Sequence, residues 1–313
     1  MRVVWLGTVL AGLLAALTVP PSPPSPSVPP PAPPSAFVSP HLPPAPPGMS
    51  AATPLTAPTV PPTPPAPDAV TGEHPEIWGH ARVVRGTRSL VIGTATASEA
   101  DLADLARRAD RASLVVARVA GPVRPLVLVP ATTAQAATLA APASVDGLAA
   151  VAATDRVIIE PGSFARLSDA GRDVVLAHEL THVATGAATD ARTPKWLVEG
   201  FADYVGYLRS GIPVREAAAE LAAEVRAGRT PSALPGPDDF APGSPRLAQA
   251  YEEAWLACRY VAARYGEPAL VALYREFRRG DRADAAGALP RALGVTAGRF
   301  TGAWRAYVKA ELS

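Results

Sequence analysis

The sequence predicts an α+β domain in which a small mixed sheet precedes a helical half, with a proline-rich segment ahead of both. More than half of the 37 prolines lie within residues 20–67. Short apolar runs bounded by turn residues fall between residues 89 and 162, which is typical of strands. Long segments with helical periodicity follow from residue 169 onward. We therefore expect one folded domain at residues 68–313.

Residues 1–19 have the pattern of an export segment. Arg2 supplies a positive charge, and the uncharged apolar run 3–19 follows it. Pro20 comes directly afterwards and no clear small-residue cleavage site precedes it, so a removed signal peptide and a retained membrane anchor are both open. Either reading places the domain outside the cytoplasm.

Residues 20–67 form a proline-rich segment with no charged residue. Such a segment cannot bury a core, and we expect a disordered linker with polyproline II character. Fully extended at about 3.1 Å per residue, it would reach on the order of 150 Å. We interpret it as a spacer; the alternative is a ligand for proline-binding modules.

Charge and cysteine content exclude several classes of protein. The formal net charge is +1, and no basic stripe with interleaved aromatic residues is present, so we expect no nucleic-acid partner. Cys258 is the single cysteine, which excludes an intramolecular disulfide and a multi-cysteine metal site. It lies in an apolar helical run, where we expect a buried thiol.

The first half of the domain should alternate strands and helices. Apolar runs at residues 89–93, 125–130 and 155–162 are bounded by turn residues and predict strands. Ser98 is a suitable N-cap for a helix at 98–120, and a shorter helix is expected at 132–140.

The second half should be almost entirely helical. Periodicity predicts helices at residues 169–186, 194–210, 214–227, 247–266, 268–279, 283–293 and 296–312. The stretch 231–245 is rich in proline and glycine and should be a loop or a mobile flap. One open hypothesis is that this loop covers a functional site of the domain and regulates access to it.

The residues His178-Glu179-Leu180-Thr181-His182 form an HExxH motif inside an apolar-periodic helix. Residues four apart are neighbours on a helix surface, so the two imidazoles can meet one ion. Zn²⁺ accepts neutral imidazole nitrogens at about 2.0–2.1 Å. Glu179 can flank the ion without binding it and act as general base toward water. The alternative is that both histidines simply pack on a helix face.

The next predicted helix supplies a third ligand. Pro194 suits its first turn, and Glu199 can then approach the two histidines from a neighbouring helix. Asp203 lies four residues beyond Glu199 on the same face. It is placed to accept the second N–H of a ligand histidine, as such residues usually do. These residues predict a single zinc ion.

The sequence resembles the gluzincin metallopeptidases, which carry HExxH on one helix and a glutamate on the next. The segment 196–202, Trp-Leu-Val-Glu-Gly-Phe-Ala, is similar to the WLxEGxA signature of the peptidase MA-like families, and the aromatic run at 251–266 is similar to their downstream helix. The resemblance covers roughly residues 150–266. It implies a zincin-like domain whose edge strand lies above the metal and aligns an extended peptide. Residues 155–160 would be that strand.

Peptide hydrolysis also needs a donor for the oxyanion. No histidine follows His182, and Tyr251 is our choice, although an ordinary core tyrosine is the alternative. Tyr204 and Tyr207 are weaker candidates. The other histidines are His41, His74 and His80, and a second metal site formed by the last two has no support.

We therefore expect a zinc peptidase that hydrolyses a peptide or protein substrate outside the cytoplasm. The alternative is a catalytically silent metal-binding protein of the cell surface. The sequence does not distinguish endopeptidase from exopeptidase, and it leaves the oligomeric state open.

Overall fold

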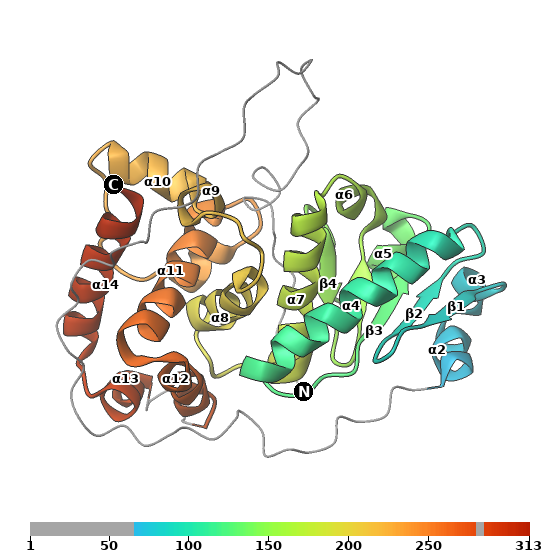
Figure 1. The fold of residues 1–313 in the computed structure, drawn as a ribbon, viewed down its shortest axis with the longest axis horizontal. Helices are drawn as coiled ribbons and strands as arrows, with labels where there is room; N and C mark the ends of the chain where they lie inside the picture. The colour runs from blue at the N-terminus through green and yellow to red at the C-terminus, as the bar shows by residue number, and fades with distance from the viewer. Residues whose placement is uncertain (1–65, 280–284) are drawn as a thin grey trace, which may run out of the picture.

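The computed structural model describes residues 66–279 and 285–313 (Figure 1). The predicted export segment, 1–19, and nearly all of the predicted linker, 20–67, lie outside the described residues. Within the described part of the chain, no helix combines the length and the apolar composition that crossing a membrane requires.

The sheet has five strands in the order β1-β2-β3-β5-β4. The central strands β2, β3 and β5 run parallel, and β1 and β4 pair antiparallel at the two edges. Parallel strands buried on both faces consist of continuous apolar residues, as β2 and β3 do here. The strand bounds are Arg82–Arg85 (β1), Leu90–Gly93 (β2), Leu126–Val129 (β3), Ala150–Ala152 (β4) and Val157–Ile159 (β5).

The three predicted strands correspond to β2, β3 and β5, whereas β1 and β4 were not predicted. The expectation that residues 155–160 form the edge strand is wrong. β5 lies between β3 and β4, and β4 is the edge. Because β4 consists of alanine and one valine, its sequence carries little strand signal.

The helices of the first half connect and cover the sheet. They are Pro67–Glu73 (α2), Pro75–Trp78 (α3), Glu99–Val119 (α4), Thr133–Ala140 (α5) and Pro161–Ala165 (α6). α4 packs on β1 and β2 and also against α7. The predicted cap of α4 is confirmed, since Ser98 Oγ accepts a hydrogen bond from the Asp101 N–H.

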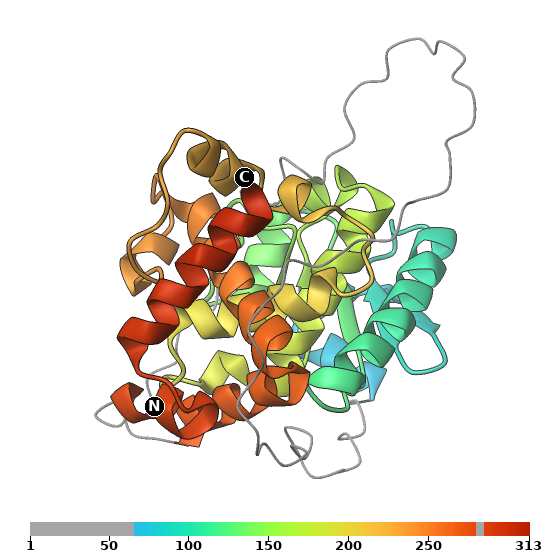
Figure 2. The same cartoon turned by 60° about the vertical axis from the view of Figure 1, so that its left-hand side comes forward.

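The second half is helical, as predicted. Its helices are Asp169–Thr185 (α7), Lys195–Tyr207 (α8), Val214–Ala217 (α9), Ala219–Arg226 (α10), Leu247–Tyr265 (α11), Glu267–Arg279 (α12), Ala285–Leu293 (α13) and Ala297–Leu312 (α14), with 3₁₀ turns Ala187–Thr189 (η1) and Pro237–Phe240 (η2). α7 lies beside the sheet, α8 packs on α7, and α11 packs on α8 (Figure 1). α14 crosses the helical half toward α10 (Figure 2).

The predicted helix at 214–227 is wrong in one respect, because Ala218 divides it into α9 and α10. Ala218 has φ −122° and ψ 51°, which is not helical. The carboxyl oxygens of Glu252, on α11, accept hydrogen bonds from the N–H groups of Glu220 and Leu221. A residue from another helix therefore satisfies the donors at the start of α10.

Two glycines allow α8 to lie very close to both neighbouring helices. A Cβ at Gly200 would be 2.2 Å from the carbonyl oxygen of Ala254 on α11, and one at Gly206 would be 3.1 Å from that of Val174 on α7. Glycine inside a helix costs roughly 0.5–1 kcal/mol relative to alanine. At these two positions glycine permits the close contacts that position α8, the helix that carries Glu199.

The loop at 231–245 is mostly irregular, as predicted, but it also contributes to the core. Phe240, in η2, is buried, and its ring lies 5.3 Å from that of Tyr251 with the two planes nearly perpendicular. Cys258 is buried, which confirms the prediction for this thiol, and Trp196 and Trp255 are buried as well.

Candidate metal centre

The helix with the HExxH motif has well-defined ends. Ser168 Oγ accepts a hydrogen bond from the Gly171 N–H at the start of α7. Gly186, with φ 65°, ends the helix in the left-handed conformation that favours glycine. The guanidinium of Arg278, on α12, donates to the carbonyl of Thr185, which places a cation at the C-terminus of α7.

The first turns of α7 are also attached to α4. The buried guanidinium of Arg108 contacts Asp104 on its own helix at 2.6 Å, and Asp169 and Asp173 on α7 at 2.5 and 2.9 Å. The three carboxylates are 39%, 81% and 45% exposed, so each ion pair contributes modestly, but together they connect α4 to the start of α7. The position of α7 is therefore determined at both of its ends.

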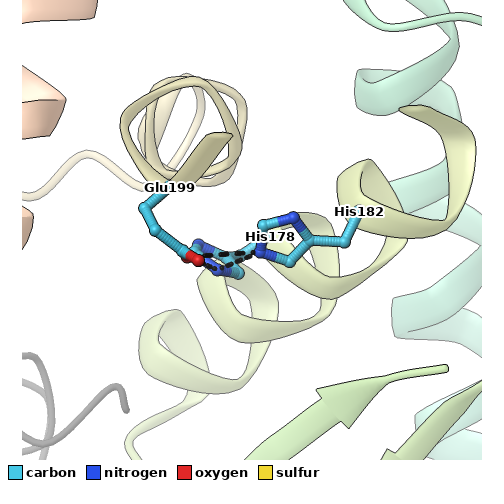
Figure 3. A group of neighbouring side chains, drawn as sticks. All are labelled: His178, His182 and Glu199. Carbon is cyan, nitrogen blue, oxygen red and sulfur yellow. Dashed lines mark hydrogen bonds and ion pairs between the residues drawn. The ribbon is translucent and has the colours of Figure 1, made fainter. Parts of the chain in front are cut away.

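His178 and His182, on α7, and Glu199, on α8, point toward one common position (Figure 3). The two Nε2 atoms are 2.9 Å apart. Oε2 of Glu199 lies 3.5 Å from Nε2 of His178 and 3.4 Å from Nε2 of His182. All three side chains are at least 94% buried. Two nitrogens and one oxygen are thus presented together by neighbouring helices.

These three distances fit a zinc ion. A point equally far from the three atoms lies about 1.9 Å from each, so an ion slightly outside their plane is at the 2.0–2.1 Å expected for zinc. Two imidazoles and one carboxylate also form a ligand set of catalytic zinc sites, which leave a fourth position for water or substrate.

Asp203 lies behind His178 as the sequence suggested. Its Oδ1 accepts a hydrogen bond from Nδ1–H of His178 at 2.8 Å, and Asp203 is fully buried. A donor bond from Nδ1 leaves Nε2 free to face the position shared with His182 and Glu199.

Burial and neighbouring charges act on these groups in different directions. Burial alone lowers the pKa of His178, but the carboxylates of Asp203, Glu199 and Glu179 raise it well above its usual value. The pKa of His182 is lowered, chiefly by burial, which favours the neutral imidazole that binds metals. Burial raises the pKa of Glu199, yet Lys195 and the two histidines hold it well below its usual value.

Glu179 lies beside the three converging atoms but is not one of them. Burial, partly opposed by His178, raises the pKa of its carboxyl to about 7. The main-chain N–H of Ala152 lies close enough to this carboxyl to oppose the rise in its pKa. The group is therefore next to β4, the edge strand of the sheet.

The outer edge of β4 faces this carboxyl. Two residues that flank β4 form hydrogen bonds to the chain on the β5 side. The Ala149 carbonyl accepts from the Glu160 N–H, and the Ala153 N–H donates to the Arg156 carbonyl. Alternate residues of an antiparallel strand bond to the same neighbour. The peptide groups of Ala150 and Ala152 therefore point away from β5, in agreement with the influence of the Ala152 main chain on Glu179.

Tyr251 lies close enough for the site to influence its hydroxyl. Its pKa is raised well above the usual value by burial and by the charges of Glu199, Asp203 and Glu179. Tyr204 is directed elsewhere, since its hydroxyl donates to Glu267 on α12 at 3.0 Å. Tyr207 is buried against Trp255, with ring centroids 4.6 Å apart.

The sequence reasoning missed three contributors to the site. The first is Lys195, whose Nζ lies 2.9 Å from Oε1 of Glu199. The others are the Ala152 peptide group, which lies beside Glu179, and Phe240, which packs against Tyr251. Lys195 was detectable, because it precedes Glu199 by four residues on a predicted helix. Neither Ala152 nor Phe240 has a comparable signal in the sequence.

No protein-family model matches the chain, and a comparison with curated proteins found no match. Among solved structures, it is similar to a mutant M1 zinc metallopeptidase from Deinococcus radiodurans, with TM-score 0.41 and 19% identity over 74% of this chain and 52% of that one. The same enzyme bound to a Tyr-Ser-Ala substrate gives TM-score 0.43, 18% identity and the same coverage. A two-domain M1 zinc metallopeptidase mutant bound to L-arginine gives TM-score 0.40, 18% identity and coverage of 73% and 51%. The chain spans about half the length of these enzymes.

Proposed function

We propose that the protein is a zinc-dependent peptidase that acts outside the cytoplasm, with His178, His182 and Glu199 as zinc ligands. One observation carries the proposal: two imidazole nitrogens and a carboxylate oxygen converge, and a separate buried carboxyl, Glu179, lies beside them. The extracytoplasmic location rests on the sequence of residues 1–19 alone.

Zinc, when bound, supplies a Lewis acid for the substrate carbonyl and lowers the pKa of water. Glu179 accepts the proton of the attacking water and passes it to the leaving amine. A carboxyl with a pKa of about 7 suits both transfers, because general acid–base catalysis works best near the working pH. Asp203 keeps His178 in the tautomer and orientation that metal binding needs.

Tyr251 is proposed as the donor to the oxyanion. Its support is the influence of the three carboxyls of the site on its hydroxyl. The ring of Phe240 packs against Tyr251 and restricts the orientation of the phenol.

A peptide substrate is supported by the outer edge of β4. Ala150 directs its N–H and C=O away from β5, on the side where the main chain of Ala152 lies beside Glu179. An extended peptide can add to such an edge as a further strand, with its main chain held by hydrogen bonds. The scissile bond would then lie next to the proposed general base.

The rival function is a catalytically silent metal-binding protein of the cell surface. A metal held only for stability has no need of a base, and burial of the Glu179 carboxyl is unfavourable and only partly offset by His178. Assaying a library of internally quenched peptides with and without a chelator separates the two functions.

Glu179→Gln is the decisive variant. It should keep the fold and one zinc per chain, and hydrolysis should fall by about 10²- to 10⁴-fold, the usual contribution of a general base. Equal hydrolysis by the variant and the wild type would exclude Glu179 as the base. Hydrolysis that survives removal of the metal would exclude the zinc mechanism.

A further inference from the structure

Lys195 is the first residue of α8 and lies one helical turn before Glu199. Its Nζ is 2.9 Å from Oε1 of Glu199, and the Glu199 side chain is only 4% exposed. The contact is an ion pair, and among the described residues the ammonium has no hydrogen-bond partner. The ammonium itself is buried, so water does not weaken this attraction as it would at the surface.

The two oxygens of Glu199 have different partners. Oε1 contacts the ammonium of Lys195, whereas Oε2 is the atom that faces Nε2 of His178 and His182. The carboxylate therefore presents one oxygen, and not both, to the position where the two histidines converge.

The stability of α8 gives little reason for a lysine at this position, because an i,i+4 pair such as Lys195–Glu199 stabilises a helix by only about 0.2–0.5 kcal/mol. A cation in the first turn opposes the helix dipole, at a cost of roughly 0.3–1 kcal/mol. The first turn of α8 contains no acidic residue, and its N-cap, Pro194, makes no side-chain hydrogen bond that could offset this cost.

The choice of lysine over arginine is informative. The chain contains only two lysines, Lys195 and Lys309, and uses arginine at every other basic position. The guanidinium of arginine presents paired N–H groups that match both oxygens of a carboxylate. The ammonium of lysine is a compact charge and can hold one oxygen while the other stays available.

We propose that Lys195 is a positioning residue that keeps Glu199 a one-oxygen zinc ligand. The inference rests on the proposed function, because it concerns how zinc is bound at that same site. A carboxylate that binds through both oxygens would occupy an additional coordination position, and a catalytic zinc needs that position for water or substrate.

Two substitutions at Lys195 test the proposal in different ways. Lys195→Met frees Oε1, so Glu199 should bind through both oxygens. The cobalt-substituted protein should then absorb more weakly in the visible range, as higher coordination numbers do, and kcat/KM should fall by roughly 10- to 100-fold. Lys195→Arg should hold both oxygens, and zinc affinity, measured against a chromophoric chelator, should fall by roughly 10- to 100-fold.

The other lysine provides a matched control. Lys309 is exposed on α14, and Lys309→Met and Lys309→Arg should leave the cobalt spectrum, the zinc affinity and kcat/KM unchanged.

Two results would overturn the inference: a wild-type cobalt spectrum in Lys195→Met, or wild-type zinc affinity in Lys195→Arg. If Lys195→Met lowers the Tm of the metal-free protein and leaves the cobalt spectrum unchanged, the lysine acts only in folding and the inference is again wrong. A wild-type protein that takes up neither zinc nor cobalt would instead refute the proposed function, so the two failures are distinguishable.

Discussion

Gly200→Ala should damage the stability of the fold and the metal site together. The added methyl group would lie 2.2 Å from the carbonyl oxygen of Ala254, and ordinary contact begins at 3.4 Å. α8 and α11 must therefore separate by about 1.2 Å. The obstacle is backbone, so no side-chain rotation can relieve it.

The size of both effects follows from this displacement. Overpacking of this kind costs about 1–3 kcal/mol, which lowers the Tm of a domain of this size by about 2–12 °C. Glu199 precedes Gly200 directly, so its carboxylate should move with the helix. Misplacement of a catalytic group by about 1 Å can cost on the order of 100-fold in rate, and we expect a comparable loss in kcat/KM.

Calorimetry, zinc titration and peptide hydrolysis measure the three consequences. Gly302→Ala is the matched control, because a Cβ at Gly302 on α14 meets nothing within 4 Å. The control should gain roughly 0.5–1 kcal/mol from the better helix former and keep full activity. If Gly200→Ala is as stable and active as the wild type, the close contact of α8 and α11 does not position Glu199.

Three further predictions concern the oxyanion donor, the substrate and the packing around α10. Tyr251→Phe should lower kcat by about 10²- to 10³-fold with KM and zinc content little changed; a wild-type kcat would exclude the oxyanion role. Ala150→Pro removes an outward N–H of the edge strand, a position where proline is tolerated. The loss of about one hydrogen bond to the substrate should lower kcat/KM several-fold. Ala150→Ser keeps the N–H and should leave kcat/KM unchanged. Glu252→Gln should alter the dependence of stability on pH. Burial, with the neighbouring Glu220, raises the pKa of Glu252 to about 10, and the usual value is 4.5. The folded wild type therefore binds an extra proton between about pH 5 and pH 10 and loses stability as the pH rises through this window. The Tm of the variant minus that of the wild type should increase between pH 5 and pH 9, and a constant difference would show that Glu252 does not titrate there.

The residues that converge on the proposed metal position were predictable because their spacing within short sequence segments identifies them. His178 and His182 share a helix at a spacing that makes them neighbours, and so do Glu199 and Asp203. Apolar periodicity then indicates which helix face is buried. The meeting of the two helices could be expected only from the resemblance to gluzincins and from the short connection between them.

The features that were missed depend on distant partners. β4 is short and alanine-rich, and only its pairing with β5 makes it a strand. No proline or glycine marks the interruption at Ala218, and the capping carboxyl group of Glu252 comes from another helix. Likewise, the constraint at Gly200 is the backbone of Ala254, which no local pattern reveals.

The zinc content of the purified full-length chain is the most direct test of the central claim. We expect one zinc ion per chain in the wild type and in Glu179→Gln, and none in His178→Ala. A wild-type protein prepared with zinc that holds none, or a His178→Ala variant that keeps one tightly bound ion, would contradict the account.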